Sequence, residues 1–229
     1  MLVISFITQK GGAGKSTLAF STAVAAHEAG ERVAILDLDC QGAAMAWAQT
    51  RARTDMFVDA VEIRELETRI EELSIGGYTL CILDAPVDEY GSERAILSSD
   101  LCIIPTRPNV FDLRSGIVTW RKAHSAGKTA AFVLNQCPPM RQVARIQEGV
   151  KALEALGVLL SPMISARVDF QDAARAGLGV TELHAKGQAA SEVREMWTSI
   201  LSVMRTEPTA LDTIEPEDLD TTEELRAAA

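Results

Sequence analysis

The 229-residue sequence lacks most features of membrane-bound, secreted or metal-scaffold proteins. No stretch approaches the roughly 20 continuous apolar residues of a membrane span, and no basic segment precedes the apolar start, so no secretory signal is expected. Only four cysteines occur, far apart and without a CxxC pair. They predict buried cytosolic thiols rather than disulfides or a zinc site: Cys40, Cys81, Cys102 and Cys137. A cytoplasmic protein is therefore expected.

Basic side chains are also scarce, with 22 Lys and Arg against 32 Asp and Glu, a net charge of −10 and a pI near 4.9. At face value this acidity argues against nucleic acid or an anionic membrane as a partner. The imbalance is uneven, however. Residues 1–100 carry 8 basic and 16 acidic side chains, residues 101–205 carry 13 and 8, and residues 206–229 carry 1 and 8. The net charge of the whole chain therefore does not exclude nucleic acid as a partner of the more basic part, residues 101–205.

The last part of the chain differs in composition from the rest. Residues 206–229 are rich in Asp, Glu and Thr, contain two prolines and have few large apolar side chains. Such a segment cannot bury enough surface to offset its ordering entropy. We therefore predict one folded domain over residues 1–205 and a disordered acidic tail over residues 206–229.

Apolar runs of strand length alternate with helical patterns along residues 1–205. The runs are continuous, as in parallel strands covered on both faces. The predicted strands are Leu2–Thr8, Arg32–Leu38, Tyr78–Asp84, Leu101–Pro105, Ala130–Asn135 and Gly157–Ser161. The predicted helices are Ser16–Ala29, Ala43–Ala52, Ile63–Leu73, Phe111–His124, Met140–Leu156, Phe170–Ala176 and Ala185–Arg205. This order predicts a doubly wound α/β fold, with a mostly parallel sheet, helices on both faces and a ligand at the carboxyl ends of the strands.

A segment rich in glycine and lysine, TQKGGAGKST, follows the first predicted strand at residues 8–17. Glycines let backbone N–H groups surround a phosphate, the next helix adds its dipole, Lys15 supplies charge and Ser16 can ligate Mg²⁺. The usual GxxxxGK[ST] spacing would need glycine in place of Gln9, and Lys10 adds a second lysine. An ordinary glycine-rich turn is the alternative. The predicted nucleotide contacts here are Gly11, Gly12, Ala13, Gly14, Lys15, Ser16 and Thr17.

These residues resemble the deviant Walker A motif, KGGxGK[ST], of the ParA/MinD superfamily of P-loop ATPases. The resemblance implies ATP and Mg²⁺ as cofactors, a weak intrinsic ATPase activity and a homodimer that forms around ATP. In that family the extra lysine reaches the nucleotide of the partner subunit. Lys10 is therefore expected to act in trans and Lys15 in cis. Two lysines this close repel each other unless a polyanion shares them, which agrees with this role.

Three carboxylates are expected at the same site. The segment VAILDLDCQG, residues 33–42, resembles the family's switch I pattern DxDPQG, with Cys40 replacing proline. The resemblance implies that Asp39 orients the attacking water, that Asp37 lies near Mg²⁺, and that Asp84 is the Walker B aspartate. Because side chains two residues apart in a strand point to the same face, Asp37 and Asp39 are expected on one side of the strand end. The alternative is that they cap the next helix.

Two later segments resemble the family's nucleoside-binding parts. The segment LCIIPTRPNVFDL, residues 101–113, resembles the IPxxPxxxDL pattern that borders adenine, which implies nucleotide contacts from Pro105 and Arg107. Asn135 resembles the asparagine that reads the adenine edge, since an amide offers a donor and an acceptor side by side. The alternatives are a surface arginine at Arg107 and a turn-forming asparagine at Asn135.

The branch of the family follows from Gln9, which precedes Lys10 as in ParA proteins. The acidic end differs from the basic membrane helix of MinD, so no membrane partner is expected. The match begins at residue 1, so no N-terminal helix-turn-helix domain is expected. Short ParA proteins of this kind act at the nucleoid in DNA segregation, plasmid partition or cargo positioning. The resemblance implies non-specific DNA binding by the ATP dimer and a ParB-like or cargo-adaptor partner that stimulates hydrolysis.

Phosphate contacts to DNA are sequence-independent and salt-sensitive. Lys186 and Arg194 are eight residues apart on the last predicted helix, roughly on one face. The alternative is that such cations are ordinary solvated side chains. The tryptophans Trp47, Trp120 and Trp197 lie on apolar helix faces and are interpreted as core or interface residues rather than base stackers. The predicted DNA contacts are Arg167, Arg175, Lys186 and Arg194.

Two other functions stay open. VirC-type conjugation proteins begin near the same KGGAGK motif and recruit a DNA-transfer complex, and a related role is recruiting a protein cluster. Metabolic synthetases that form dethiobiotin or amidate cobyrinate share the P-loop fold. The trans lysine, Lys10, argues against a synthetase because those enzymes do not generally need one.

Overall fold

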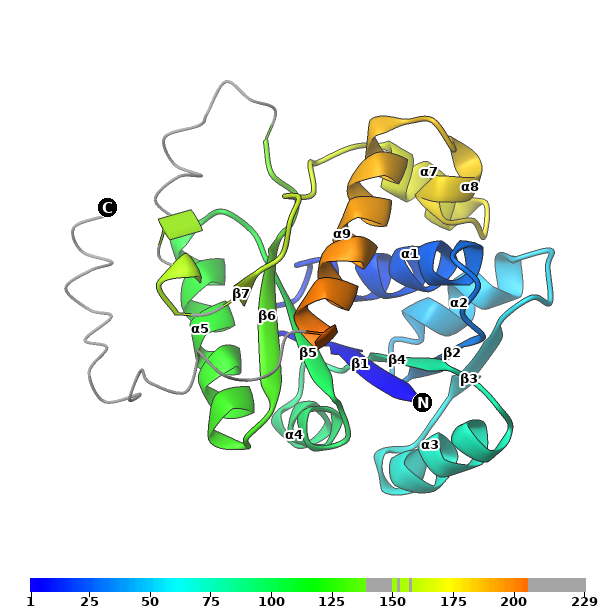
Figure 1. The fold of residues 1–229 in the computed structure, drawn as a ribbon, viewed down its shortest axis with the longest axis horizontal. Helices are drawn as coiled ribbons and strands as arrows, with labels where there is room; N and C mark the ends of the chain where they lie inside the picture. The colour runs from blue at the N-terminus through cyan, green and yellow to red at the C-terminus, as the bar shows by residue number, and fades with distance from the viewer. Residues whose placement is uncertain (139–149, 152, 157, 206–229) are drawn as a thin grey trace.

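The structure is a computed structural model that describes residues 1–138, 150–151, 153–156 and 158–205 (Figure 1). Most of the predicted helix Met140–Leu156 and the whole predicted tail 206–229 lie outside the described residues. Within the described residues, one parallel sheet forms the centre of the molecule, and helices cover both of its faces (Figure 1).

The sheet contains seven strands in the order β3-β2-β4-β1-β5-β6-β7. Each neighbouring pair runs parallel. The predicted doubly wound fold is thereby confirmed. The order reverses direction at β1, because β4 lies on one side of it and β5 on the other, which is where such folds bind ligands. The strands are β1 Leu2–Phe6, β2 Val33–Asp37, β3 Phe57–Ala60, β4 Leu80–Asp84, β5 Leu101–Thr106, β6 Thr129–Leu134 and β7 Val158–Leu159.

The helices pack against the two faces of the sheet and enclose two separate apolar cores. One face carries α1 Lys15–Glu28, α2 Ala43–Thr50, α7 Asp169–Arg175, α8 Val180–Leu183 and α9 Gln188–Arg205. The other carries the short 3₁₀ helix η1 Ile63–Glu65 together with α3 Leu66–Ile75, α4 Glu89–Leu97 and α5 Val110–Ser125. Two cores follow from the strands themselves, because successive side chains of a strand point to opposite faces.

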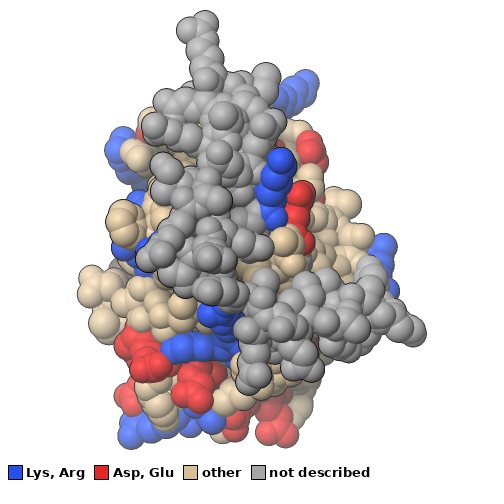
Figure 2. Space-filling model, turned by 90° about the vertical axis from the view of Figure 1, so that its left-hand side faces the viewer, with Lys and Arg blue, Asp and Glu red and all other residues tan. Residues whose placement is uncertain are grey.

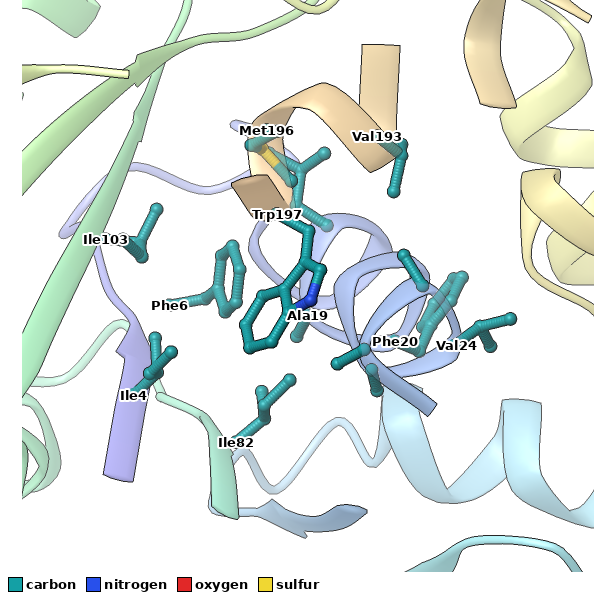
Figure 3. Close-up of a cluster of buried hydrophobic side chains, with 14 of the residues drawn as sticks. Ile4, Phe6, Ala19, Phe20, Val24, Ile82, Ile103, Val193, Met196 and Trp197 are labelled. Atoms are coloured by element: carbon teal, nitrogen blue, oxygen red, sulfur yellow. The ribbon is translucent and has the colours of Figure 1, made fainter. Parts of the chain in front are cut away.

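The core under α1 and α9 is centred on an aromatic side chain. Trp197 of α9 lies among Phe6, Ala19 and Ile82, which come from β1, α1 and β4 (Figure 3). Its exposed fraction is 4%. Trp47 and Trp120 are buried as well, so the interpretation of the tryptophans as core residues is confirmed.

Three elements were not expected from the sequence: β3, α4 and the four-residue helix α8. Strand β3 is a four-residue, partly exposed edge strand, so its apolar pattern is short and weak. Helix α4 contains Gly91, which ordinarily disfavours a helix. Here a Cβ at Gly91 would collide with Pro86, so the close approach requires glycine. The side chain of Asp88 caps α4 by accepting a hydrogen bond from Gly91 N at 2.8 Å.

The predicted last helix, Ala185–Arg205, begins later than expected. Helix α9 starts at Gln188, and a turn closed by the hydrogen bond from Gly187 N to His184 O, 2.7 Å long, precedes it. Lys186 therefore lies in this turn and not on the helix. The expectation that Lys186 and Arg194 share one helix face is wrong, because the turn interrupts the helical periodicity.

The turn after α7 packs on the end of α2, and this contact gives a stability prediction. A Cβ at Gly177, whose φ is +66°, would lie 2.5 Å from Arg51 N. Gly127 has the same φ of +66° and no atom within 4 Å of such a Cβ. Alanine at either position costs about 1–2 kcal/mol in left-handed strain. Only Gly177→Ala adds an overlap with backbone, which costs roughly 1–3 kcal/mol more.

We therefore expect urea unfolding to show a loss of unfolding free energy of about 1 kcal/mol for Gly127→Ala and about 3 kcal/mol for Gly177→Ala. Equal losses in the two variants would contradict the close contact between α2 and the turn after α7.

Candidate functional site

The segment between β1 and α1 has the backbone conformation of a phosphate loop. Gly12 and Gly14 adopt φ values of +76° and +94°, which side chains other than glycine rarely tolerate. Gly14 is the N-cap residue of α1, and the first turn closes with the hydrogen bond from Leu18 N to Gly14 O at 2.9 Å. The predicted contacts at positions 11–17 thus meet at the N-terminus of a helix, where N–H groups and the helix dipole favour an anion.

The two lysines of this loop occupy different environments. Lys15 is buried, with 7% of its surface exposed, and burial lowers its pKa while the nearby carboxylates of Asp84 and Asp39 raise it. Lys10 is exposed, and among the described residues it makes no ion pair. One ammonium is therefore buried inside the site, and the other is exposed to solvent.

Asp84 is the carboxylate best prepared for a cation. It ends β4, stands in register beside Asp37 of β2, and is fully buried. Burial raises its pKa to about 7, while the Ser16 hydroxyl and Lys15 act in the opposite direction. Within the described residues neither carboxylate oxygen makes a hydrogen bond of standard geometry. A buried carboxylate with open oxygens beside a serine hydroxyl suits Mg²⁺, which accepts one or two protein groups and completes its shell with phosphate and water.

The carboxylates of Asp37 and Asp39 differ in their hydrogen-bond partners. The two oxygens of buried Asp37 accept hydrogen bonds from Asp39 N at 3.2 Å and Met45 N at 2.9 Å. Met45 lies in the first turn of α2, so the helix-capping alternative is observed for Asp37. Burial raises the pKa of Asp37, and these N–H groups lower it. Asp39 is half-buried and uses only Oδ1, which accepts from Gln41 N at 3.0 Å.

Two amide side chains after β6 support the phosphate loop. Asn135 Nδ2 donates to Ala13 O at 2.7 Å, and Gln136 Nε2 donates to Gly12 O at 2.9 Å. Asn135 Oδ1 accepts from Gln136 N at 2.8 Å, so both ends of the Asn135 amide are engaged within the protein. A Cβ at Gly14 would collide with Asn135, which is a second reason for glycine there.

Pro105 lies in strand β5, and Arg107 follows the end of that strand. The Arg107 side chain is 31% exposed and pairs with buried Asp112 of α5, with Nε 2.7 Å from Oδ1. Its Nη1 lies 3.9 Å from the position of a Cβ at Gly12, so the guanidinium stands beside the phosphate loop. Pro105 is buried within the strand, opposite Val133 in register.

A pocket of about 530 Å³ opens beside the start of α1. Its lining comes from three parts of the chain: Gly14, Thr17 and Leu18, then Asn135 and Gln136, and then Ser165, Ala166, Arg167, Val168, Phe170, Gln171 and Ala174. The volume falls within the range of small-molecule sites, and the pocket adjoins the phosphate loop. Pro105 and Arg107 are not among its lining residues.

The four cations predicted to contact DNA are spread around α7, α8 and α9. Arg167 lines the pocket and pairs with Glu192 at 3.0 Å. Arg194 pairs with Glu28 at 3.0 Å and donates to Ala185 O at 2.6 Å. The side chain of Arg175 is 80% exposed, and its nearest acid is Asp172 at 3.6 Å. Lys186 is exposed and, among the described residues, unpaired.

One buried arginine, Arg51, was not identified from the sequence. Its guanidinium donates to Asp55 and Glu182, at 2.8 Å each, and to Gly177 O at 3.1 Å. It joins the end of α2 to the α7–α8 turn. Gln136 and Glu192 were missed as well, because an amide or carboxylate in a loop or on a helix carries no sequence signal for a partner far along the chain.

The cysteines correct one expectation. Cys81, Cys102 and Cys137 are buried, and burial raises the pKa of Cys81 to about 12 and those of the other two to about 11. They are inert thiols, as expected. Cys40 is exposed, so the expectation of a buried thiol is wrong there. The reason is its position in the turn between β2 and α2, which leaves the sheet for solvent.

Comparison with known protein families decides the identity of this fold and loop. The family model described as "CobQ/CobB/MinD/ParA nucleotide binding domain" matches residues 4–180, which include the phosphate loop and all three carboxylates. The chain belongs to this family. It is a ParA/MinD-type P-loop ATPase, and the resemblance inferred from the motifs is confirmed.

Individual relatives agree with the family. "Maintenance of carboxysome distribution protein A" of Gloeobacter kilaueensis is 31% identical over 195 residues, covering 83% of this chain and 88% of that protein. Protein virC1 of Rhizobium rhizogenes is 29% identical, covering 71% and 76%. Among solved structures, the MinC:MinD complex of Aquifex aeolicus has a TM-score of 0.76 at 17% identity, covering 88% and 96%. Apo McdA of Cyanothece has a TM-score of 0.74 at 15% identity, covering 89% and 99%.

The residues present fit the cofactors of this family, ATP and Mg²⁺. MinD of Pyrococcus horikoshii, with a TM-score of 0.74 to this chain, was solved with Mg-ADP. Here the glycine loop and Lys15 form an anion site, and the unpaired oxygens of Asp84 lie in reach of Ser16. Among the described residues no three His, Cys, Asp or Glu side chains form a metal cluster. Ser16 and Asp84 are thus the chain's own candidates for Mg²⁺, supplemented by phosphate and water.

The raised pKa of Asp84 predicts how stability depends on pH without nucleotide or metal. Folded Asp84 holds its proton up to about pH 7, whereas the unfolded value is 3.8. The folded state therefore binds more protons between these values, and the free energy of unfolding falls as the pH rises from about 4 to about 7. Asp84→Asn removes this contribution. Between pH 5 and pH 8 the wild-type protein should lose roughly 2–3 kcal/mol more than the variant.

The measurement is urea unfolding in EDTA at both pH values. Parallel pH dependence of the wild-type protein and Asp84→Asn would contradict the assignment of a buried, proton-holding carboxyl at Asp84.

Proposed function

We propose that this ATPase positions a cargo along DNA, as a short ParA-type protein. In this proposal the ATP-bound protein forms a homodimer that binds DNA without sequence preference. Hydrolysis, stimulated by a ParB-like or cargo-adaptor partner, releases the DNA, and the protein is associated with the nucleoid in the cytoplasm. The observation that carries the proposal is the separation of the two lysines: Lys15 is buried in its own site, and Lys10 is exposed and unpaired among the described residues.

The proposed roles follow from the geometry. Lys15 and the loop N–H groups hold the phosphates, and Ser16 and Asp84 hold Mg²⁺, which supplies charge neutralisation on the phosphates. Asp39, with Oδ2 free of hydrogen bonds among the described residues, orients the water that attacks. Asp37 positions this segment by capping α2 and binding Asp39 N. Lys10 extends to the nucleotide of a second copy, which makes ATP a requirement for dimerisation.

The named relatives support positioning as the coarse function. The Gloeobacter relative is named for maintaining carboxysome distribution, and at 31% identity it covers 83% of this chain. Two virC1 proteins are 29% and 28% identical to this chain. This similarity supports a second candidate function, which is to recruit a DNA-transfer complex or a protein cluster. A synthetase of the same fold has less support, because such enzymes do not generally need the second lysine, Lys10.

The surface that contacts DNA is proposed to lie around α7, α8 and α9. On the face shown in Figure 2, described basic and acidic side chains are interspersed rather than gathered into one basic area. Arg175 and Lys186 are exposed cations of the α7–α9 region. Helices α7 and α8 lie toward the right of Figure 1, away from the left-hand side that Figure 2 shows. No helix of the described residues is long and apolar enough to cross a membrane. We propose Arg175, Lys186 and Arg194 as candidate phosphate contacts.

The test is sedimentation and DNA binding with ADP, ATP and a non-hydrolysable ATP analogue, repeated over a range of salt concentrations. We expect a dimer and DNA binding only with ATP or the analogue, on any sequence. Affinity should fall steeply with salt, with a slope that reports the number of phosphate contacts. The matched control is Lys10→Ala, which should bind nucleotide but form neither the dimer nor the DNA complex.

A dimer without DNA binding would favour the recruiting role over DNA positioning. Persistence of the dimer in Lys10→Ala would overturn the proposed role of this lysine.

A further inference from the structure

The pocket beside the phosphate loop has one charged residue in its lining. Arg167 is the charged residue among those that line the pocket, and the others are apolar or carry neutral polar groups. Phe170 and Leu18 contribute apolar surface. Because the pocket begins at Gly14 and Thr17, it adjoins the site of the phosphates and has the volume for a base and sugar.

Arg167 is held in place by a carboxylate of another element. Glu192 of α9 accepts hydrogen bonds from Arg167 Nη2 at 3.0 Å, Ser165 N at 3.0 Å and Ser165 Oγ at 2.8 Å. The exposed fractions of the Arg167 and Glu192 side chains are only 28% and 15%. One carboxylate thus fixes both the backbone and the guanidinium of the segment that faces the phosphate loop.

The pairing leaves donor capacity on Arg167. Arg167 Nε is buried and has no hydrogen-bond partner among the described residues. Because Nε has almost no surface toward the pocket, a ligand there would meet the part of the Arg167 side chain that stays exposed, 28% of it. Guanidinium groups bind the acceptor atoms of bases and sugars and stack on aromatic rings.

We infer that Arg167 binds the nucleoside of ATP and ADP, with Glu192 as its positioning residue, and that Arg167 is not a DNA contact. The inference rests on the nucleotide site proposed above. The nucleoside does not change during hydrolysis, so an interaction with it stabilises the ground state and the transition state equally. Loss of Arg167 therefore raises KM and the Kd for ADP by the same factor and leaves kcat unchanged.

The first experiment measures Mg-ADP and Mg-tripolyphosphate binding by calorimetry. Tripolyphosphate carries the phosphates without a nucleoside. For Arg167→Ala we expect the Kd for ADP to rise about 10-fold or more, as for loss of a charge-assisted hydrogen bond. The Kd for tripolyphosphate should stay unchanged. Arg167→Met, which retains the apolar stem, should behave in the same way and replaces the alanine variant if that one fails to fold.

The matched control is Arg64→Ala. Arg64 also pairs with glutamates, with Glu62 at 2.8 Å and with Glu65 at 3.6 Å, but its side chain is 73% exposed and it lies on η1, across the sheet from the pocket. It should leave both dissociation constants at the wild-type value.

The positioning role of Glu192 has its own readout. Glu192→Gln should raise the Kd for ADP by a smaller factor, about 3-fold, and should add nothing in the Arg167→Ala background, since the two residues act as one unit. Additive effects would show that Glu192 acts on the fold alone.

The results of these binding measurements distinguish a failure of the role inferred for Arg167 from a failure of the proposed nucleotide site. Unchanged ADP binding in Arg167→Ala, with DNA binding weakened, would overturn the inference and restore the DNA role. Equal losses of ADP and tripolyphosphate binding would overturn it as well, because the residue would then act on phosphate. Absence of ADP binding in the wild-type protein would contradict the nucleotide site itself.

Discussion

Lys15→Ala is expected to weaken nucleotide binding by about two orders of magnitude or more. Lys15 is the buried cation of the phosphate loop, and burial both removes it from water and fixes it next to Asp84 and Asp39. Two charge-assisted hydrogen bonds to phosphate contribute about 3–5 kcal/mol, so the Kd for Mg-ADP should rise roughly 100-fold or more. Dimerisation and DNA binding, which need ATP in the proposed mechanism, should disappear together.

The matched variant is Lys10→Ala. Its side chain is exposed and outside the subunit's own pocket, so the Kd for ADP should remain near the wild-type value while ATP-dependent dimerisation is lost. Calorimetry with ADP and sedimentation with an ATP analogue measure the two effects. A dimer that still forms and binds DNA in Lys15→Ala would overturn the nucleotide mechanism.

Asp39→Ala is expected to separate ATP binding from hydrolysis. Asp39 is half-buried near Lys15, and its Oδ1 is engaged only by Gln41 N, 3.0 Å away. Removing a positioned acceptor for the attacking water should lower kcat by about 10²–10⁴-fold. ATP binding does not require this carboxylate, so the variant should bind ATP, dimerise and stay on DNA longer than the wild-type protein.

Asp37→Ala provides the contrast for this prediction. Asp37 caps α2, so its loss should lower the free energy of unfolding by about 1 kcal/mol or more. Asp39 does not cap the helix, and Asp39→Ala should unfold near the wild-type midpoint. Single-turnover hydrolysis, analogue binding and urea unfolding distinguish the two variants. Wild-type turnover by Asp39→Ala would exclude its role with water.

The phosphate loop was predictable from the sequence because its requirements are local. The two glycines with positive φ, Gly12 and Gly14, are needed wherever a loop turns this tightly, and Lys15 follows at a fixed spacing. The parallel sheet was predictable for a similar reason. Each strand covered on both faces shows a continuous apolar run, and that signal requires no knowledge of the neighbouring strands.

Elements without a local signal were missed or misplaced. Strand β3 is short and half-exposed, and α4 contains Gly91, whose position has no room for a Cβ beside Pro86. Cys40 was expected to be buried because thiols usually are. Its exposure follows from the turn between β2 and α2, which the pattern of apolar residues does not describe.

The contacts within the site depend on residues far apart in the chain. Asn135 and Ala13 are 122 positions apart, and their hydrogen bond engages an amide that the sequence assigned to the adenine edge. Arg167 was predicted to contact DNA, whereas the structure places it in the pocket wall, paired with Glu192. A residue's type gives its chemistry, but its partner follows from the path of the chain.

The sequence by itself determined the family, the parallel fold and the residues of the phosphate loop, because periodicity, glycine positions and motif spacing are properties of neighbouring residues. Only the tertiary structure decided which carboxylate oxygens lack a hydrogen-bond partner within the described residues. Asp37 ends β2, and its two oxygens accept hydrogen bonds from Asp39 N and from Met45 N of α2. Asp84 ends β4, and among the described residues neither of its oxygens has a hydrogen-bond partner. The physical reason is that hydrogen-bond satisfaction depends on which backbone groups the fold brings within about 3 Å, and no local pattern records that.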